Sequence, residues 1–151
     1  MEYRIADKND TEMLMEIRLE MLRAVNDLPE DHVFSDELIE SSRRYFLDGD
    51  QTTAIAVDNG RTAACAAISY FRIMPTFSHP TGRRAHLMNV YTRPEYRRKG
   101  IALRLVEMLT EDAAAKGATE ISLDATDSGR PLYEKLGFRG SEECMVMTLD
   151  P

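Results

Sequence analysis

The sequence contains no tryptophan, only two cysteines and no long apolar stretch. Its longest unbroken apolar run, Ala63–Ile68, is far shorter than the roughly 20 residues that a membrane-spanning helix needs. The N-terminus lacks a basic segment followed by an apolar one, so we expect no secretory signal. Cys65 and Cys144 cannot form a disulfide framework, and both fall in strand-like segments. We therefore expect a protein of the reducing cytoplasm, with no membrane partner.

Positive charge is scarce as well. Lysine and arginine total 19 against 26 aspartates and glutamates, which gives a net charge of −7. This balance argues against broad binding of nucleic acids, which are themselves anionic. The three histidines show no metal-ligand spacing, so we expect no metal site. A length of 151 residues with 43% hydrophobic residues is typical of one globular domain, here residues 1–151.

Apolar periodicity and turn residues predict a mixed α/β chain. Asp10, Ser35 and Ser128 are candidate helix N-caps, and Gly117 stands where a helix would end in a left-handed residue. Asn59-Gly60 predicts a tight hairpin turn. We expect helices after Asp10 and Ser35 and over residues 100–116 and 128–136, and strands over 2–6, 52–57, 62–73, 86–92, 120–124 and 145–149. This order indicates a mixed α/β fold on one central sheet.

The most informative segment runs from Val90 to Ala102, where a strand is followed by Arg97-Arg98-Lys99 and a helix that begins at Gly100. We call Arg97–Lys99 the basic turn. The first N–H groups of a helix have no intrahelical partner and lie at the positive end of its dipole, so they favour an anion. Gly100 has no Cβ to keep a phosphate from the backbone. The alternative is a solvated basic turn before an ordinary helix. Neither the P-loop pattern nor the dinucleotide-binding glycine pattern is present.

Two motifs resemble the GNAT superfamily of acyl-CoA N-acyltransferases. Arg97-x-x-Gly100-x-Ala102 is similar to its Arg/Gln-x-x-Gly-x-Gly/Ala motif, and residues 132–138, Leu-Tyr-Glu-Lys-Leu-Gly-Phe, are similar to its Leu-Tyr-x-Lys-x-Gly-Phe block. The resemblance implies a central mixed sheet with splayed middle strands and helices on both faces. It also implies acetyl-CoA as the donor substrate.

The resemblance further implies how the donor would bind. Its pantetheine arm would lie between the splayed strands, beside Asn89, Val90 and Thr92, and its pyrophosphate would lie against the basic turn. The backbone N–H groups expected at the pyrophosphate belong to Arg98, Lys99, Gly100, Ile101, Ala102 and Leu103. Thr126 stands where the family often has asparagine and keeps a hydrogen-bonding group. Gly129 replaces a small alanine of the family.

Two residues are candidates for proton transfer. The resemblance points to Tyr133 as the general acid, and a phenol, with a pKa near 10, stays protonated at neutral pH. The alternative is a tyrosine that packs its ring on the core. Asp124 ends an expected strand and is our candidate base, against the alternative that it caps the following turn. For Cys65 and His86 we favour structural roles over nucleophile and base, respectively.

The sequence therefore predicts an N-acetyltransferase that moves an acetyl group to a primary amine of a small molecule or peptide by direct attack. A backbone N–H near Val90 would stabilise the oxyanion. The alternative is a non-catalytic CoA-binding sensor or partner domain. The acidic residues Glu30, Asp31 and Asp36 could attract a cationic amine or simply face solvent. The sequence identifies neither the acceptor nor whether the protein forms a homodimer.

Overall fold

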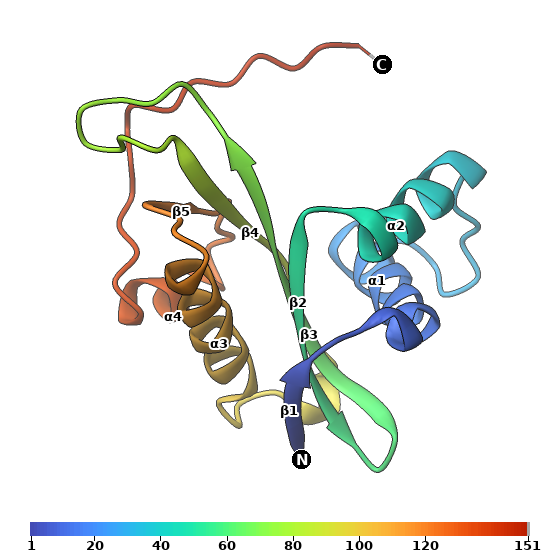
Figure 1. The fold of residues 1–151 in the computed structure, drawn as a ribbon. Coiled ribbons are helices and arrows are strands. Elements are labelled where there is room, and N and C mark those ends of the chain that lie inside the picture. The colour runs from blue at the N-terminus through green and yellow to red at the C-terminus, as the bar shows by residue number, and fades with distance from the viewer. Residues whose placement is uncertain (151) are drawn as a thin grey trace.

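The computed structural model describes residues 1–150 and confirms the mixed α/β fold on one central sheet (Figure 1). Its regular elements are the strands β1 (Glu2–Ile5), β2 (Gln51–Asp58), β3 (Arg61–Arg72), β4 (Arg83–Thr92) and β5 (Ile121–Ser122), the helices α1 (Thr11–Val25), α2 (Asp36–Asp48), α3 (Ile101–Ala115) and α4 (Arg130–Lys135), and the short 3-10 turns η1 (Lys8–Asp10) and η2 (Pro94–Tyr96). Within these residues, no helix combines the length and the apolar character that crossing a bilayer demands.

The five strands form one mixed sheet in the order β1-β2-β3-β4-β5. The first four are antiparallel to their neighbours, whereas β4 and β5 are parallel. Strand β5 pairs with β4 at only two positions, Ala85 with Ile121 and His86 with Ser122. Beyond His86 the two strands separate, as the resemblance implied.

Helices cover both faces of the sheet: α1 and α2 pack on one face, and α3 and α4 on the other (Figure 1). In β2, Ala54 and Ala56 face α3, while Ile55 between them faces α1. Strand β3 is buried on both faces and is therefore apolar along residues 63–68 without alternation. Its small side chains allow Leu105 and Leu109 of α3 to pack with no exposed surface.

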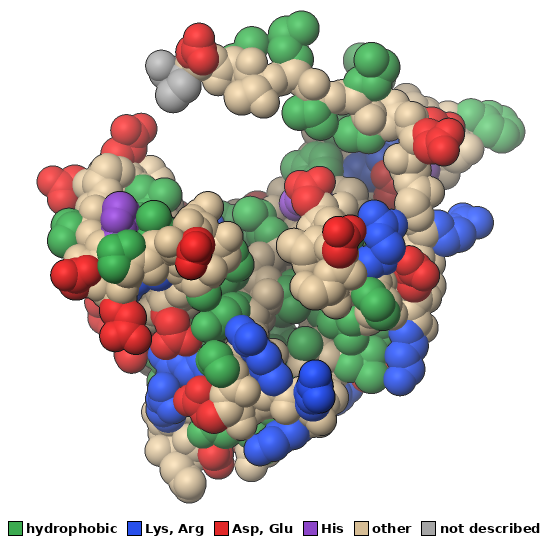
Figure 2. Space-filling view, turned by 180° about the vertical axis from the view of Figure 1, so that it is seen from behind, with side chains coloured by type: hydrophobic (Ala, Val, Ile, Leu, Met, Phe, Trp, Pro, Cys, Tyr) green, Lys and Arg blue, Asp and Glu red, His purple; other side chains and the backbone are tan. Residues whose placement is uncertain are grey.

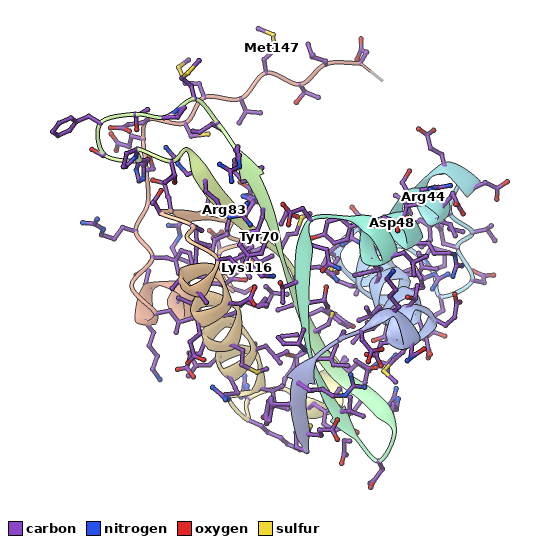
Figure 3. All side chains as sticks on the ribbon, viewed as in Figure 1. Arg44, Asp48, Tyr70, Arg83, Lys116 and Met147 are labelled. Carbon is purple, nitrogen blue, oxygen red and sulfur yellow. The ribbon has the colours of Figure 1, made fainter. Side chains whose placement is uncertain are left out.

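The C-terminal end of α3 is fastened to the sheet through Tyr70 of β3. The Tyr70 hydroxyl donates to Asp112 Oδ2 at 2.6 Å, and the charged ends of Arg83 and Lys116 lie 5.0 and 4.9 Å from its ring centroid. Figure 3 shows these side chains between the strands and the helix. This contact holds α3 at one end, while its other end meets the basic turn.

Several local predictions are confirmed. Asn59 and Gly60 both have positive φ, 49° and 79°, as the tight hairpin turn requires. The Ser35 hydroxyl accepts from Leu38 N at 3.2 Å and caps α2. Gly117, with φ 79°, ends α3 in the left-handed conformation.

Two cap predictions are wrong. Asp10 precedes α1 but makes no side-chain cap, because its carboxylate is bound by Arg4. Ser128 does not cap the last helix, which begins after Gly129 with no side-chain cap at all. The Ser128 hydroxyl instead lies 3.2 Å from the Thr126 hydroxyl.

The strand expected over 145–149 is also absent from the described chain. Residues 139–150 form no helix or strand, and Met145 and Met147 are 93% and 84% exposed. The segment runs away from the sheet, with Met147 near its far end (Figure 3). A strand exists through its partners, and β-favouring residues without a neighbouring strand do not form one. Cys144, expected in a strand-like segment, is exposed outside any strand, whereas Cys65 is buried in β3.

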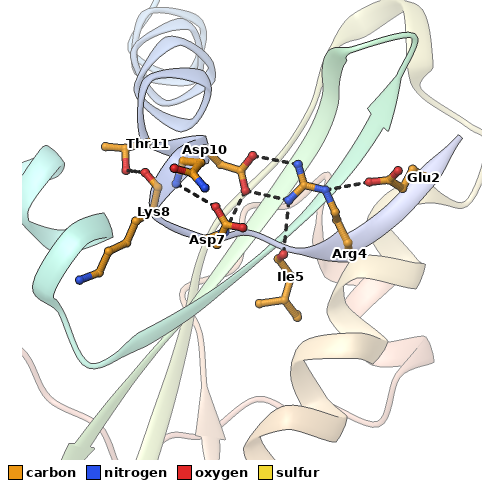
Figure 4. A network of polar contacts seen from close by, with 8 residues as sticks. Glu2, Arg4, Ile5, Asp7, Lys8, Asp10 and Thr11 are labelled. Atoms are coloured by element: carbon orange, nitrogen blue, oxygen red, sulfur yellow. Dashed lines mark hydrogen bonds and ion pairs between the residues drawn. The ribbon is translucent and has the colours of Figure 1, made fainter.

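A polar network joins β1 to the start of α1 (Figure 4). The Arg4 guanidinium donates to both oxygens of Asp10, at 2.7 and 2.8 Å, and to Glu2 at 2.7 Å. Asp10 Oδ2 also accepts from Asp7 N at 2.8 Å. Asp10 is only 6% exposed, and the hydrogen bonds from Arg4 lower the pKa of its carboxyl below the ordinary value of 3.8.

We expect Asp10→Asn to lower the free energy of unfolding by roughly 1.5–3 kcal/mol, the range for a hydrogen bond to a charged group. Chemical denaturation measures this. Because the folded pKa is lowered, the stabilisation is complete above the unfolded pKa, near 3.9, and disappears as the pH falls through the folded value. The difference between wild type and variant should therefore shrink below about pH 4.

Glu2→Gln is the matched control, since Glu2 binds the same arginine from an exposed position. It should change stability by no more than about 0.5 kcal/mol. Equal effects of the two substitutions would show that the buried Arg4–Asp10 pair stabilises the fold no more than the exposed Arg4–Glu2 pair does.

Candidate active site

The fork between β4 and β5 contains a backbone irregularity. Along β3, Cys65 pairs with Tyr91 and Ala67 pairs with Met88, so Asn89 and Val90 together oppose the single residue Ala66. This is a β-bulge, and Asn89 has a positive φ of 57°. Bulges redirect side chains and backbone groups and are frequent beside active sites. The bulge lies in the part of β4 that β5 has already left.

The basic turn joins β4 to α3 at the open end of the fork. Arg97, Arg98, Lys99 and Gly100 are all exposed. Arg98 and Gly100 have positive φ, 63° and 75°, and a Cβ at Gly100 would meet nothing within 4 Å. Gly100 is the N-cap of α3 without a side-chain cap, so within residues 1–150 the first N–H groups of the helix have no side-chain cap. Figure 2 shows lysine and arginine side chains gathered below the hollow between the two helical layers. The arrangement suits an anion.

The position of this turn is set by contacts from both sides. Arg93, 3% exposed, donates to Thr62 O at 2.8 Å and to Glu20 at 3.2 Å, which ties the end of β4 to α1. The Tyr96 hydroxyl donates to Asp58 at 3.0 Å, and Arg61 binds Glu95 at 2.5 Å. Glu95 is thus exposed but paired.

Tyr133 lies on α4 and packs half-buried against the α3-side core. Its ring meets Phe138 edge-to-face with 5.9 Å between centroids. Within residues 1–150 its hydroxyl has no hydrogen-bond partner, and burial raises its pKa above 10.0. A Cβ on Gly129 would come within 3.2 Å of the Tyr133 ring, so the glycine at this position gives the ring room. Because the pKa of Tyr133 lies above 10.0, its hydroxyl is protonated at neutral pH.

The expected base, Asp124, follows β5 and is fully exposed. Its Oδ2 lies 3.7 Å from Nε2 of His86, whose Nδ1 lies 2.7 Å from the Ser122 hydroxyl. His86 and Ser122 are the last paired residues of the fork. Thr126 lies further along the same loop, and its hydroxyl accepts from Gly129 N at 3.1 Å.

Two pockets lie on the α1 side of the molecule. One, of about 510 Å³, contains Glu16, Glu20 and Glu30, so Glu30 joins a larger acidic group than the sequence indicated, while Asp31 and Asp36 stay exposed outside it. The other, of about 190 Å³, lies between α1, α2 and β4. No cluster of metal-ligating side chains occurs among residues 1–150.

The second pocket contains Arg18, a residue that the sequence reasoning missed. The sequence did contain a signal for Arg18. It follows Ile17 directly and lies four residues after Leu14 and three before Met21, so it borders the apolar stripe of its helix. A cation beside such a stripe indicates a buried contact or a binding site.

Comparison with known proteins identifies relatives of one kind. The family described as the acetyltransferase (GNAT) family matches residues 12–138. A glucosamine 6-phosphate N-acetyltransferase of Trypanosoma brucei brucei is 33% identical over 90 residues, which are 60% of this chain and 59% of that protein. The match thus spans less than two thirds of that relative's length. A thialysine N-epsilon-acetyltransferase of Sus scrofa is 27% identical over 134 residues, 82% of this chain and 79% of that protein.

Among solved structures, that of a predicted acetyltransferase from Clostridium acetobutylicum with acetyl-CoA is similar with a TM-score of 0.85 and 30% identity. The match covers 97% of this chain and 95% of that one. A GCN5-related N-acetyltransferase from Ralstonia eutropha has a TM-score of 0.80 at 23% identity, which shows a shared fold.

Proposed function

The chain belongs to the acetyltransferase (GNAT) family, and on this premise we propose that it transfers an acetyl group from acetyl-CoA to a primary amine of a small molecule or peptide. The observation that supports this most is the β4–β5 fork, which contains a bulge and opens toward the basic turn. Acetyl-CoA fits the path from the fork to the basic turn, because its pantetheine arm joins the thioester at one end of the molecule to the pyrophosphate. The similar structure from Clostridium acetobutylicum contains acetyl-CoA.

In this proposal the donor pyrophosphate binds the basic turn and the N-terminus of α3, from Arg98 to Leu103. Positive charge, exposed backbone and the absence of a Cβ at Gly100 support the assignment. The pantetheine arm lies along residues 89–92, where β4 has no neighbour in β5. Arg97 helps to hold the turn, since its Nε donates to Thr92 O at 3.0 Å.

The chemistry is direct attack. The amine nitrogen forms a bond to the thioester carbon, the carbon–sulfur bond breaks, and a backbone N–H near Val90 stabilises the oxyanion. Asp124 accepts the amine proton, directly or through water, and its proximity to His86 places both at the closed end of the fork. Tyr133 donates its proton to the leaving thiolate, and water returns that proton afterwards. Its raised pKa and unbonded hydroxyl support the role.

We further propose that residues 1–151 act as a single acetyltransferase domain without a metal ion, in the cytoplasm. The two free cysteines, Cys65 and Cys144, suit a reducing compartment.

The direct test is to measure free CoA formed from acetyl-CoA across a panel of primary amines. Chromatography is preferable to a thiol reagent, because the exposed Cys144 would itself react. The proposal requires CoA and an acetylated amine in equal amounts. Tight CoA binding without acetylation of any amine would instead favour the non-catalytic CoA-binding domain.

We expect Gly100→Val to raise the dissociation constant of CoA at least tenfold, because a branched side chain would stand where the pyrophosphate approaches. Isothermal titration measures this. Gly117→Val is the matched control at the other end of α3: φ is 79° there against 75°, and a Cβ likewise meets nothing. It causes the same backbone strain without touching the donor. Equal losses of CoA affinity in both variants would refute the phosphate assignment.

We expect Tyr133→Phe to lower kcat at least tenfold with CoA affinity nearly unchanged, since a general acid contributes about 10²–10⁴-fold. Steady-state kinetics and CoA titration check this together. Tyr3→Phe is the matched control. It also removes a phenol hydroxyl, from a half-buried ring that packs on the same core at the opposite edge of the sheet. It should leave kcat unchanged. A normal kcat in Tyr133→Phe would assign the tyrosine to packing.

A further inference from the structure

Arg18 is a half-buried cation without an anionic partner in residues 1–150. Its single hydrogen bond runs from Nη1 to Asn89 Oδ1 at 3.1 Å. A guanidinium has five N–H donors, and removing it from water is costly unless it is paired. Burial accordingly lowers the pKa of Arg18, and the groups that oppose this lowering are Cys65 and Tyr45, not a carboxylate. Arg4 and Arg93, by contrast, each bind carboxylates.

The pocket that contains Arg18 has the right lining for a small organic anion. It measures about 190 Å³, and its wall includes no aspartate or glutamate. Ser41, Ser42 and Tyr45 supply hydroxyl groups, and the Tyr45 hydroxyl already lies 2.7 Å from Ser69 Oγ. The full lining is Arg18, Ser41, Ser42, Tyr45, Phe46, Met88 and Asn89. One cation, adaptable hydroxyl donors and an apolar wall are the elements of an orienting ligand site.

The pocket also reaches the reacting centre of the proposed function. Asn89, which accepts from Arg18, is a residue of the bulge, and Met88 precedes it. Ala85 and Leu87 face α3, so the alternation of β4 turns His86 and Met88 toward α1 and α2. An occupant of this pocket would therefore approach the bulge from the face opposite α3.

The larger pocket has the opposite electrostatic character. Glu16, Glu20, Glu30 and Glu95 contribute to its wall beside Arg23 and Arg61. An anion would be repelled there, whereas in the smaller pocket it would meet the one cation. The two sites thus distinguish charged groups of opposite sign.

We propose that Arg18 binds an oxyanion of the acceptor, so that the acceptor is an amine that also bears a carboxylate or a phosphate. This inference rests on the proposed function for the role of the bound molecule as acceptor. The anionic group lies against the Arg18 guanidinium and the serine hydroxyls, and the amine points toward the bulge. The second charge of the acceptor thereby fixes its orientation.

The test uses two matched pairs of amines: lysine with 1,5-diaminopentane, which lacks only the carboxylate, and glucosamine 6-phosphate with glucosamine. We expect the anionic member of at least one pair to have a kcat/KM at least tenfold higher, and the pair concerned distinguishes carboxylate from phosphate. Arg18→Gln should abolish this preference by raising the KM for the anionic amine, while the KM for acetyl-CoA stays unchanged. Arg18→Lys, which keeps the charge but not the planar fork, should restore part of it.

Arg44→Gln is the matched control. Arg44 lies on α2 outside the pocket and pairs with Glu40 and Asp48 on the surface (Figure 3), so its loss should leave the preference intact. The proposal is wrong if the neutral amines react as well as the anionic ones, or if Arg18→Gln impairs all four equally, which would indicate a role in positioning Asn89 alone.

Failure of the proposed function gives a different result. If no amine is acetylated, the anion site is tested by isothermal titration of the CoA-loaded protein with lysine and with glucosamine 6-phosphate. Binding that Arg18→Gln abolishes would support the site in a non-catalytic protein. No binding, or binding that the substitution leaves unchanged, would overturn it.

Discussion

Strand β4 is paired with β3 over most of its length but with β5 at only two positions, Ala85–Ile121 and His86–Ser122. Parallel strands must be joined by a crossover, and here α3 is that crossover. Because β5 leaves β4 after His86, the second half of β4 lacks a neighbour on that side. The bulge at Asn89 and Val90 lies in this half, and the basic turn follows directly. The exposed edge of β4, along which the pantetheine arm would lie in the proposed reaction, exists because this pairing is short.

The distribution of charge is the second organising feature. In a chain with net charge −7, most arginines that come near the core are neutralised by carboxylates, as Arg4 is by Asp10 and Arg93 by Glu20. Among residues 1–150, neither the basic turn, open to solvent at the start of α3, nor Arg18, in the pocket beside the bulge, has a carboxylate partner. Cations without carboxylate partners in residues 1–150 thus lie at both ends of the proposed path of the reaction: one group where the donor would be held, the other where the acceptor would be oriented.

The sheet between these sites is rigid because both its faces are covered. The alanines of β2 and β3 let α3 approach closely, and larger side chains such as Ile55 fill the space under α1. A sheet packed on both faces resists deformation, which suits a reaction whose geometry must hold to fractions of an ångström. The same packing makes β3 apolar without alternation.

The sequence by itself determined those features that depend on neighbours along the chain. The hairpin at Asn59-Gly60, the cap at Ser35 and the end of α3 at Gly117 were predicted correctly, since each rests on backbone preferences of one or two residues. The two motifs around Gly100 and Tyr133 also indicated the family, because their spacing is written in the sequence. Their roles in binding and catalysis stay predictions.

Only the tertiary structure decided which distant groups meet. Asp10 is a good cap residue locally, yet Arg4, brought close by β1, binds its carboxylate instead. Residues 145–149 favour a strand, but no strand adjoins them in the described chain. Arg18 and Asn89 are 71 positions apart, and their contact arises from packing α1 over a bulge in β4. Hydrogen bonds and ion pairs between remote segments form according to where packing leaves each group, and no local pattern contains that information.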